Sequence, residues 1–213
     1  EETAPVPSEE KELAEVFQKL VRRLPDDAGV HAGFGSALLK LGRAEKAAGM
    51  FARAAALDPE NAYVLDSLGK ACFVAGKAAK GLEACRAAIE ADPAYRAPYE
   101  IADRHLREQK TPGERVARWR DIAETHPDNV LAWVFLGRAL AGAGQHQAAA
   151  AALRTALEIE PEHPEARRLL DRALLKTGKP PASGPGVTES PERLCKRAAA
   201  LREEGRKEAA ADA

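Results

Sequence analysis

Basic residues that recur at a fixed interval are the first candidates for chemistry. Four of them are spaced 34 residues apart: Lys70, Arg104, Arg138 and Arg172. A row of such cations could receive the carboxylates of an acidic peptide, or a chain's C-terminal carboxylate, through charge-assisted hydrogen bonds. The first two cations follow a carboxylate by four residues (Asp66 and Glu100), which is the spacing of an ordinary helical ion pair. The binding interpretation is therefore strongest for Arg138 and Arg172.

Other reactive residues do not form the patterns that catalysis or metal binding requires. The five histidines are scattered, and no Ser/His/Asp set, phosphate-binding loop or HExxH motif occurs. Cys72, Cys85 and Cys195 form no CxxC pair and no zinc-spaced cluster. Cys72 and Cys85 are expected to be small apolar core residues, with a bridge between them as the alternative. We therefore expect no enzyme activity, no cofactor and no metal site.

Charge and composition restrict the partners further. The chain has 32 basic and 33 acidic residues and a net charge of −1, which gives no field suited to nucleic acid or an anionic membrane. No apolar run reaches the roughly 20 residues that cross a bilayer, so no direct membrane insertion is expected. The alanine-rich, lysine-poor composition favours a bacterial source. It leaves the compartment open between the cytoplasm and the periplasm.

Five prolines share the same interval and locate the elements that must position these residues. They are Pro25, Pro59, Pro93, Pro127 and Pro161, each 34 residues after the last. A fixed period of 34 is typical of helix–turn–helix repeats, which bury their apolar faces only by stacking. Gly42, Gly76 and Gly144 are expected at the turn inside each repeat, because glycine adopts the left-handed conformation at no steric cost.

One repeat shows the pattern most completely. It has Trp133 at position 4, Leu136-Gly137 at positions 7 and 8, Ala149 and Ala156 at positions 20 and 27, and Pro161 at position 32. This pattern resembles the tetratricopeptide repeat family over roughly residues 13–179. Small residues at positions 8, 20 and 27 let helices approach closely. The resemblance implies an all-α, right-handed superhelical solenoid of antiparallel helix pairs, whose first helices line a concave groove.

The repeat phase predicts the organisation of the whole chain. The expected segments are a flexible N-terminal arm (1–7), a repeat solenoid (8–179), a linker (180–190) and a C-terminal helix (191–213). Within the solenoid we expect a half-repeat (8–27), four full repeats (28–61, 62–95, 96–129 and 130–163) and a capping helix (164–179). The last segment is interpreted either as a truncated further repeat or as a helix that docks on the cap or on another molecule.

The repeat 96–129 departs from the pattern, because Asp103 and Arg115 replace small residues at positions 8 and 20. In the family these two positions face each other across the hairpin. We therefore expect an ion pair between Asp103 and Arg115. The alternative is that both side chains extend to solvent and the hairpin widens.

The resemblance also places apolar residues in the groove beside the cations. They are Leu39, Tyr63, Phe73, Val74, Leu131 and Val134, and they either contact a partner or bury against a neighbouring repeat. We expect a non-catalytic scaffold that binds a protein or peptide segment, acidic in the cationic interpretation, and helps to assemble a multiprotein complex. The expected binding residues are Lys70, Arg104, Arg138, Arg172, Tyr63, Phe73, Leu131 and Val134. The alternatives are the repeat arm of a larger multidomain enzyme, such as a transferase, and a self-assembling scaffold that forms homo-oligomers through residues 191–213.

Overall fold

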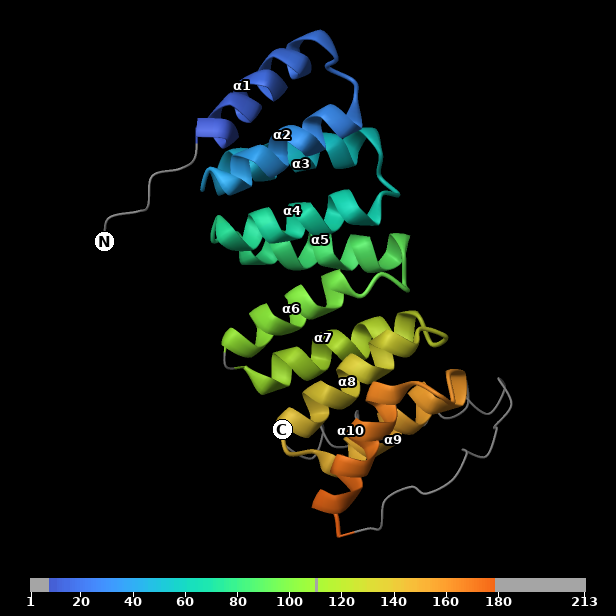
Figure 1. Ribbon diagram of the computed structural model, residues 1–213. Helices are drawn as coiled ribbons and strands as arrows, with labels where there is room; N and C mark the ends of the chain where they lie inside the picture. Colours follow the sequence, from blue (N-terminus) through green and yellow to red (C-terminus); the bar gives the residue numbers. More distant parts are fainter. Residues whose placement is uncertain (1–7, 110, 179–213) are drawn as a thin grey trace. The chain divides into compact units, whose positions relative to one another are not determined.

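The secondary structure is helical throughout the computed structural model, which describes residues 8–109 and 111–178. These residues form ten α-helices and no strand (Figure 1). The helices are α1 (Ser8–Arg23), α2 (Ala28–Lys40), α3 (Ala44–Leu57), α4 (Ala62–Val74), α5 (Ala78–Ala91), α6 (Ala97–Glu108), α7 (Pro112–Thr125), α8 (Val130–Gly142), α9 (His146–Ile159) and α10 (Pro164–Lys176). The predicted all-α fold class is confirmed. The predicted linker and C-terminal helix lie outside the described residues.

Two compact units divide the chain, residues 1–105 and 106–213. In the first unit α1 packs on α2, α2 on α3, α3 on α4 and α4 on α5. In the second unit α7 packs on α8, α8 on α9 and α9 on α10. Figure 1 shows the paired helices α2 and α3, and α4 and α5, following one another in chain order. Packing between sequence neighbours is the arrangement expected of stacked helical repeats.

Left-handed glycines end the first helix of the hairpins, as the sequence predicts. Gly42, Gly76 and Gly144 have φ angles of 70°, 73° and 79°. At the first of these turns, Arg43 N–H donates to Leu38 O at 2.8 Å and Gly42 N–H donates to Leu39 O at 2.9 Å. This pair of bonds is the Schellman motif, which satisfies carbonyl groups that the helix end would otherwise leave unpaired. The turn therefore brings the second helix of each pair back along the first.

Glycine at position 8 lets the two helices of a hairpin approach closely. A Cβ atom added at Gly137 would lie 2.6 Å from Leu153 Cγ. The same addition at Gly69 would lie 2.9 Å from Cys85 Sγ. Real Cβ atoms do not approach other atoms so closely, so only glycine fits without rearrangement. The predicted role of the small residue at position 8 is confirmed for these two hairpins.

Side-chain caps begin most of the first helices. Four side chains accept a hydrogen bond from the backbone N–H three residues later, at 2.9–3.2 Å: Asp27, Asn61, Asn129 and His163. These four residues share one position in the 34-residue frame. Their bonds satisfy a backbone donor that the start of a helix leaves unpaired. Tyr95 occupies the remaining position of this frame and has a different role, described below.

A second recurring bond joins the first helix of four repeats to the proline that ends the preceding repeat. Four side chains at position 4 hydrogen-bond to the carbonyl oxygen of the proline six residues earlier, at 2.8–3.0 Å: His31, Tyr99, Trp133 and Arg167. In these four helices position 4 therefore supplies a polar group, whereas Leu65 of α4 supplies bulk alone. The bond satisfies a carbonyl beyond the end of the preceding helix. The sequence pattern predicts only the bulk of this position, and the bond was not anticipated.

Asp103 and Arg115, the two charged residues at small-residue positions of the repeat 96–129, are each buried in their own unit. Asp103 and Arg115 are both almost fully buried, which excludes the alternative in which both charges extend to solvent. A Cβ added at Gly142 would lie 3.0 Å from Arg115 Nη1, so this guanidinium packs against α8. The ion pair between Asp103 and Arg115 stays a prediction.

Candidate partner-binding surface

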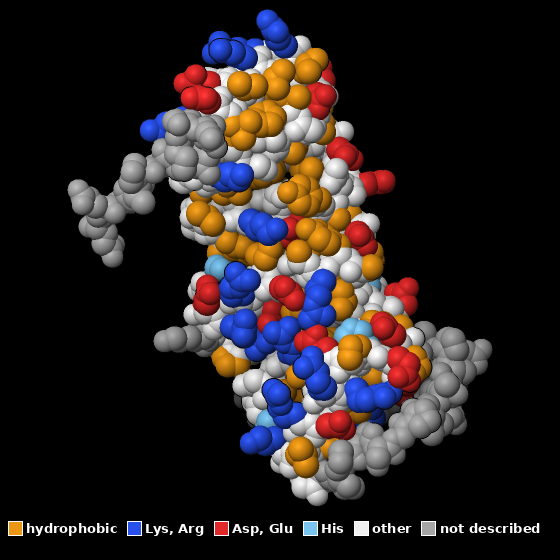
Figure 2. Space-filling view, in the orientation of Figure 1, with side chains coloured by type: hydrophobic (Ala, Val, Ile, Leu, Met, Phe, Trp, Pro, Cys, Tyr) orange, Lys and Arg blue, Asp and Glu red, His pale blue; other side chains and the backbone are white. Residues whose placement is uncertain are grey.

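Helix α4 presents two strongly exposed apolar side chains. Tyr63 is 60% exposed and Val74 is 70% exposed. With about 3.6 residues per turn, Tyr63, Lys70 and Val74 fall on one face of α4. Figure 2 shows hydrophobic side chains gathered over the α2–α5 part of the molecule, with basic side chains between them. This face of α4 is the centre of the candidate surface in the first unit.

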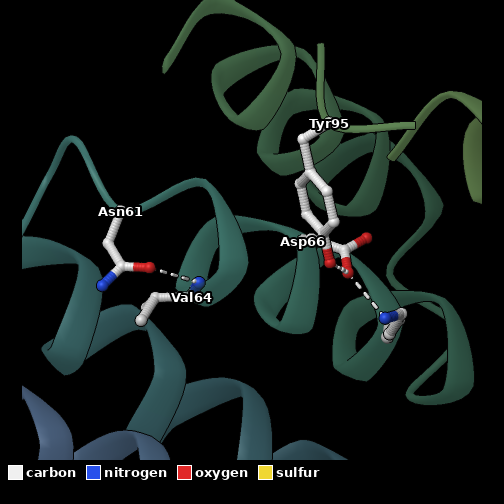
Figure 3. A network of polar contacts seen from close by, with 5 residues as sticks. Asn61, Val64, Asp66 and Tyr95 are labelled. Atoms are coloured by element: carbon white, nitrogen blue, oxygen red, sulfur yellow. Dashed lines mark hydrogen bonds and ion pairs between the residues drawn. The ribbon is translucent and has the colours of Figure 1, made fainter. Parts of the chain in front are cut away.

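A buried carboxylate lies beneath this face. Asp66 is fully buried, and its Oδ2 accepts hydrogen bonds from Lys70 Nζ at 2.6 Å and from Tyr95 O–H at 3.0 Å (Figure 3). Its Oδ1 is buried and has no partner among the described residues. Lys70 therefore forms an ion pair with Asp66, as the spacing of four residues indicates. It is a weaker candidate for a partner's carboxylate than the sequence analysis alone suggests.

Tyr95 is the residue of this network that the sequence analysis missed. Burial and the neighbouring Asp66 carboxylate raise the pKa of Tyr95 from 10.0 to about 12. The tyrosine comes from the segment between α5 and α6, so its bond ties the end of the repeat 62–95 to its first helix, α4. The available signal is its place in the 34-residue frame, where tyrosine replaces the capping residues Asp27, Asn61 and Asn129.

Helix α6 extends the surface beside α4. The Phe73 ring stacks on His105 with 4.4 Å between ring centroids and 24° between planes. Arg104 is exposed next to this stack and forms no ion pair or hydrogen bond with a described residue. Glu100 instead pairs with Arg96 at 2.7 Å, so the predicted alternative of a Glu100–Arg104 pair is wrong. We call Tyr63, Lys70, Phe73, Val74 and Arg104 the α4–α6 surface.

The two predicted binding arginines of the second unit, Arg138 and Arg172, have different surroundings. Arg138 Nη1 lies 3.6 Å from Glu165 Oε1, and its guanidinium carbon lies 4.7 Å from the centroid of the Phe135 ring. No carboxylate precedes Arg138 by four residues in the sequence, but α10 supplies Glu165 as its partner. Arg172 is exposed and has no ion pair among the described residues.

The remaining predicted apolar residues are covered to different degrees. Val134 is 0% exposed, so it offers no surface to a partner and the prediction of a contact there is corrected. Leu131 is half-buried. Leu39 is also half-buried and packs against the core that contains Leu38 and Phe51. For Val134 and Leu39 the alternative of burial within the repeats describes the structure better than the binding interpretation.

Comparison with known families explains this architecture. One model of the tetratricopeptide repeat matches two overlapping ranges, residues 14–62 and 32–96, and a second model of this repeat matches residues 140–183. The chain belongs to the tetratricopeptide repeat family. Repeats of this family indicate a scaffold for protein–protein interaction, and proteins built from them are generally non-catalytic. The fold of this tetratricopeptide repeat protein suggests other proteins as its partners.

Solved structures with a similar fold include other tetratricopeptide repeat proteins. The C-terminal part of a TPR repeat-containing protein from Cytophaga hutchinsonii is 14% identical, with a TM-score of 0.54. That match covers 80% of this chain and 67% of that chain. YrrB, described as a TPR protein with an unusual peptide-binding site, is 19% identical over 78% of this chain and 85% of that chain, with a TM-score of 0.47. MamA is 19% identical over 70% and 81%, with a TM-score of 0.49. No curated protein gives a significant match.

The described part of this tetratricopeptide repeat protein also bears on other kinds of site. Within residues 8–109 and 111–178, no cluster of three His, Cys, Asp or Glu side chains could hold a metal ion. None of the helices there is both long enough and apolar enough to cross a membrane. Cys72 and Cys85 are buried free thiols, as their predicted core positions require. Burial raises the pKa of Cys85 to about 12, with the Asp66 carboxylate adding to the shift. Cys195 lies outside the described residues.

Proposed function

We propose that the α4–α6 surface binds a segment of a partner protein. The observation that carries this proposal is the exposure of Tyr63 (60%) and Val74 (70%) on one face of α4. Large apolar side chains left in water favour contact with apolar groups of another chain. Tyrosine is also common among the residues that dominate binding energy, since it contributes a large ring and a polar end. The proposed partner segment therefore places apolar side chains along α4.

An acidic residue in the partner segment would complement the cationic edge of this surface. Arg104 is exposed and without an ion pair among the described residues, whereas Lys70 is bonded to Asp66 at 2.6 Å. Arg104 can therefore receive a carboxylate without losing an internal bond. The proposed segment combines apolar residues, which face Tyr63 and Val74, with an Asp or Glu that faces Arg104. In this proposal the chain assembles other proteins and performs no catalysis itself.

Selection from a random peptide library tests the proposal with the full chain as bait. We expect enriched peptides to contain aliphatic or aromatic residues near an acidic one. Their affinity should fall about tenfold or more for the double variant Tyr63→Ala, Val74→Ser, because each lost contact removes roughly 1 kcal/mol. Arg104→Glu should weaken the binding of peptides that contain Asp or Glu and reverse its salt dependence, because added salt screens the new repulsion.

The matched control is Leu175→Ser, which changes a side chain on α10 that is equally exposed. This variant should bind the selected peptides as the unchanged chain does. If the selected peptides bind all variants equally, the α4–α6 surface is not their site. If no peptide is enriched at all, the proposed mode of binding is wrong.

A further inference from the structure

Helix α1 has an apolar face that no described helix covers fully. Leu13 is 42% exposed, Val16 is 51% exposed and Leu20 is partly exposed. Residues three and four positions apart share one side of a helix, so these three side chains form a continuous stripe. A neighbouring side of α1 packs on α2, where the Phe17 ring lies over Gly33. The stripe is therefore a second apolar surface, separate from the contact with α2.

Equivalent positions in α3 and α9 have smaller side chains than this stripe. In the 34-residue frame Leu13 and Leu20 correspond to Ala47 and Ala54, which are fully buried in the hairpin of α2 and α3. The same two positions of α9 are also alanines without exposed surface. Small residues there allow the first helix of the repeat to approach closely. Leucine at both positions of α1 is bulkier, so a helix that covers the stripe must lie farther from α1 than α2 lies from α3; α7, with Arg115 and Ile122 at these positions, also has large side chains there.

Charged residues along the edge of the stripe indicate the direction of the helix that would cover it. Glu12 lies in the first half of α1, and Lys19 and Arg23 lie in the second half, on the same side as Val16. All three are exposed, and none forms an ion pair with a described residue. A second α1 placed antiparallel puts Glu12 opposite Lys19 and Arg23 of the other copy. In a parallel pair this edge would face the opposite edge of the other helix, so Glu12 would not meet Lys19 and Arg23.

We propose that α1 is a dimerisation helix, in which the α1 stripes of two copies of this chain pack antiparallel. Leu13 of each copy lies against Leu20 of the other, and Val16 lies near the twofold axis. The contacts between Glu12 and the basic pair Lys19 and Arg23 form twice by symmetry. Twofold pairing through one self-complementary surface is the commonest form of homo-oligomer. The dimer does not require the α4–α6 surface to bind a partner.

Light scattering coupled to size exclusion tests this with the full chain over a concentration series. The mass should approach twice the 22.8 kDa of one chain as the concentration rises. Val16→Glu places a charge at the centre of the interface and should leave the mass of one chain at the same concentrations. Leu175→Glu, which changes a more exposed apolar side chain on α10, should leave the dimer intact. Circular dichroism checks that each variant keeps its helices.

Charge exchange distinguishes the antiparallel pair from other contacts. Glu12→Lys alone should lose the dimer, and so should the double variant Lys19→Glu, Arg23→Glu. An equimolar mixture of these two proteins should recover it, because every edge contact in the mixed pair is again between opposite charges. Recovery in the mixture is specific to pairing between the two halves of α1.

Three results would overturn the proposal. The first is a single-chain mass at every concentration. The second is an oligomer that survives Val16→Glu. The third is a dimer that is lost on Leu194→Glu, Leu201→Glu, which would assign the contact to residues 191–213 instead of a second α1.

Discussion

Replacing Tyr95 by phenylalanine tests how firmly the segment between α5 and α6 is tied to α4. The substitution removes the O–H that donates to Asp66 Oδ2 at 3.0 Å, and it keeps the ring. Asp66 is fully buried, so water cannot replace this donor without rearrangement. Hydrogen bonds to charged groups contribute about 1.5–3 kcal/mol. We therefore expect Tyr95→Phe to lower the free energy of unfolding by about 2 kcal/mol, measured by urea titration with circular dichroism.

The pH dependence of this difference identifies the phenol as its source. Burial and the Asp66 carboxylate raise the pKa of Tyr95 from 10.0 to about 12, so the folded chain holds the proton more tightly than the unfolded chain. The stabilisation is complete below pH 10 and is lost as the pH rises through about 12. The phenylalanine variant has no such proton. The gap in stability between the two proteins should therefore narrow over this interval.

The control for this experiment is Tyr63→Phe, which removes a hydroxyl from a tyrosine that is 60% exposed. We expect this variant to unfold at the same urea concentration as the unchanged chain. A double-mutant cycle of Tyr95→Phe with Asp66→Asn should give a coupling energy of about 1 kcal/mol or more. Equal stability of Tyr95→Phe and the unchanged chain would refute the reasoning, and so would a difference that does not vary with pH.

Two further changes probe the packing of the repeats by the same urea titration. Trp133→Phe loses the N–H that donates to Pro127 O at 2.9 Å together with part of a buried ring, and should cost about 1–3 kcal/mol; an unchanged midpoint would show that this bond contributes nothing. Gly137→Ala places a Cβ 2.6 Å from Leu153 Cγ and should destabilise by about 1–3 kcal/mol. Gly49→Ala, inside α3 with no atom within 4 Å of the added Cβ, should stabilise by up to about 1 kcal/mol; two alanine variants of equal stability would contradict the close contact at Gly137.

The hairpins could be predicted from the sequence because their determinants are local and recur. A left-handed glycine ends the first helix wherever the turn requires positive φ, as at Gly42, and its position follows from the period alone. The glycine at position 8 is equally predictable, because the contact of Gly137 with Leu153 lies within one hairpin. Each such signal needs only the residues of one repeat and its frame. The same frame therefore predicts the fold class and the candidate core together.

The partners of charged residues could not be predicted in the same way. Glu100 has an arginine four residues before it and another four residues after it, and the spacing cannot choose between Arg96 and Arg104. The structure chooses Arg96, at 2.7 Å. Arg138 finds its carboxylate, Glu165, on a different helix. Such contacts depend on side-chain directions across neighbouring repeats, which a periodic pattern does not contain.

Position 5 of the repeat shows that some expected groove residues stabilise the fold and do not face a partner. The resemblance places this position in the groove, yet Asp66 and Val134 are fully buried there. Asp66 is covered through its bonds to Lys70 and Tyr95. Val134 belongs to α8, which packs on α7, α9 and α10 and so has little free surface. Residues at position 5 of these two repeats therefore hold neighbouring elements together, and specificity for a partner has to come from the side chains that remain exposed around them. In the first unit those side chains are the ones on the face of α4 that carries Tyr63.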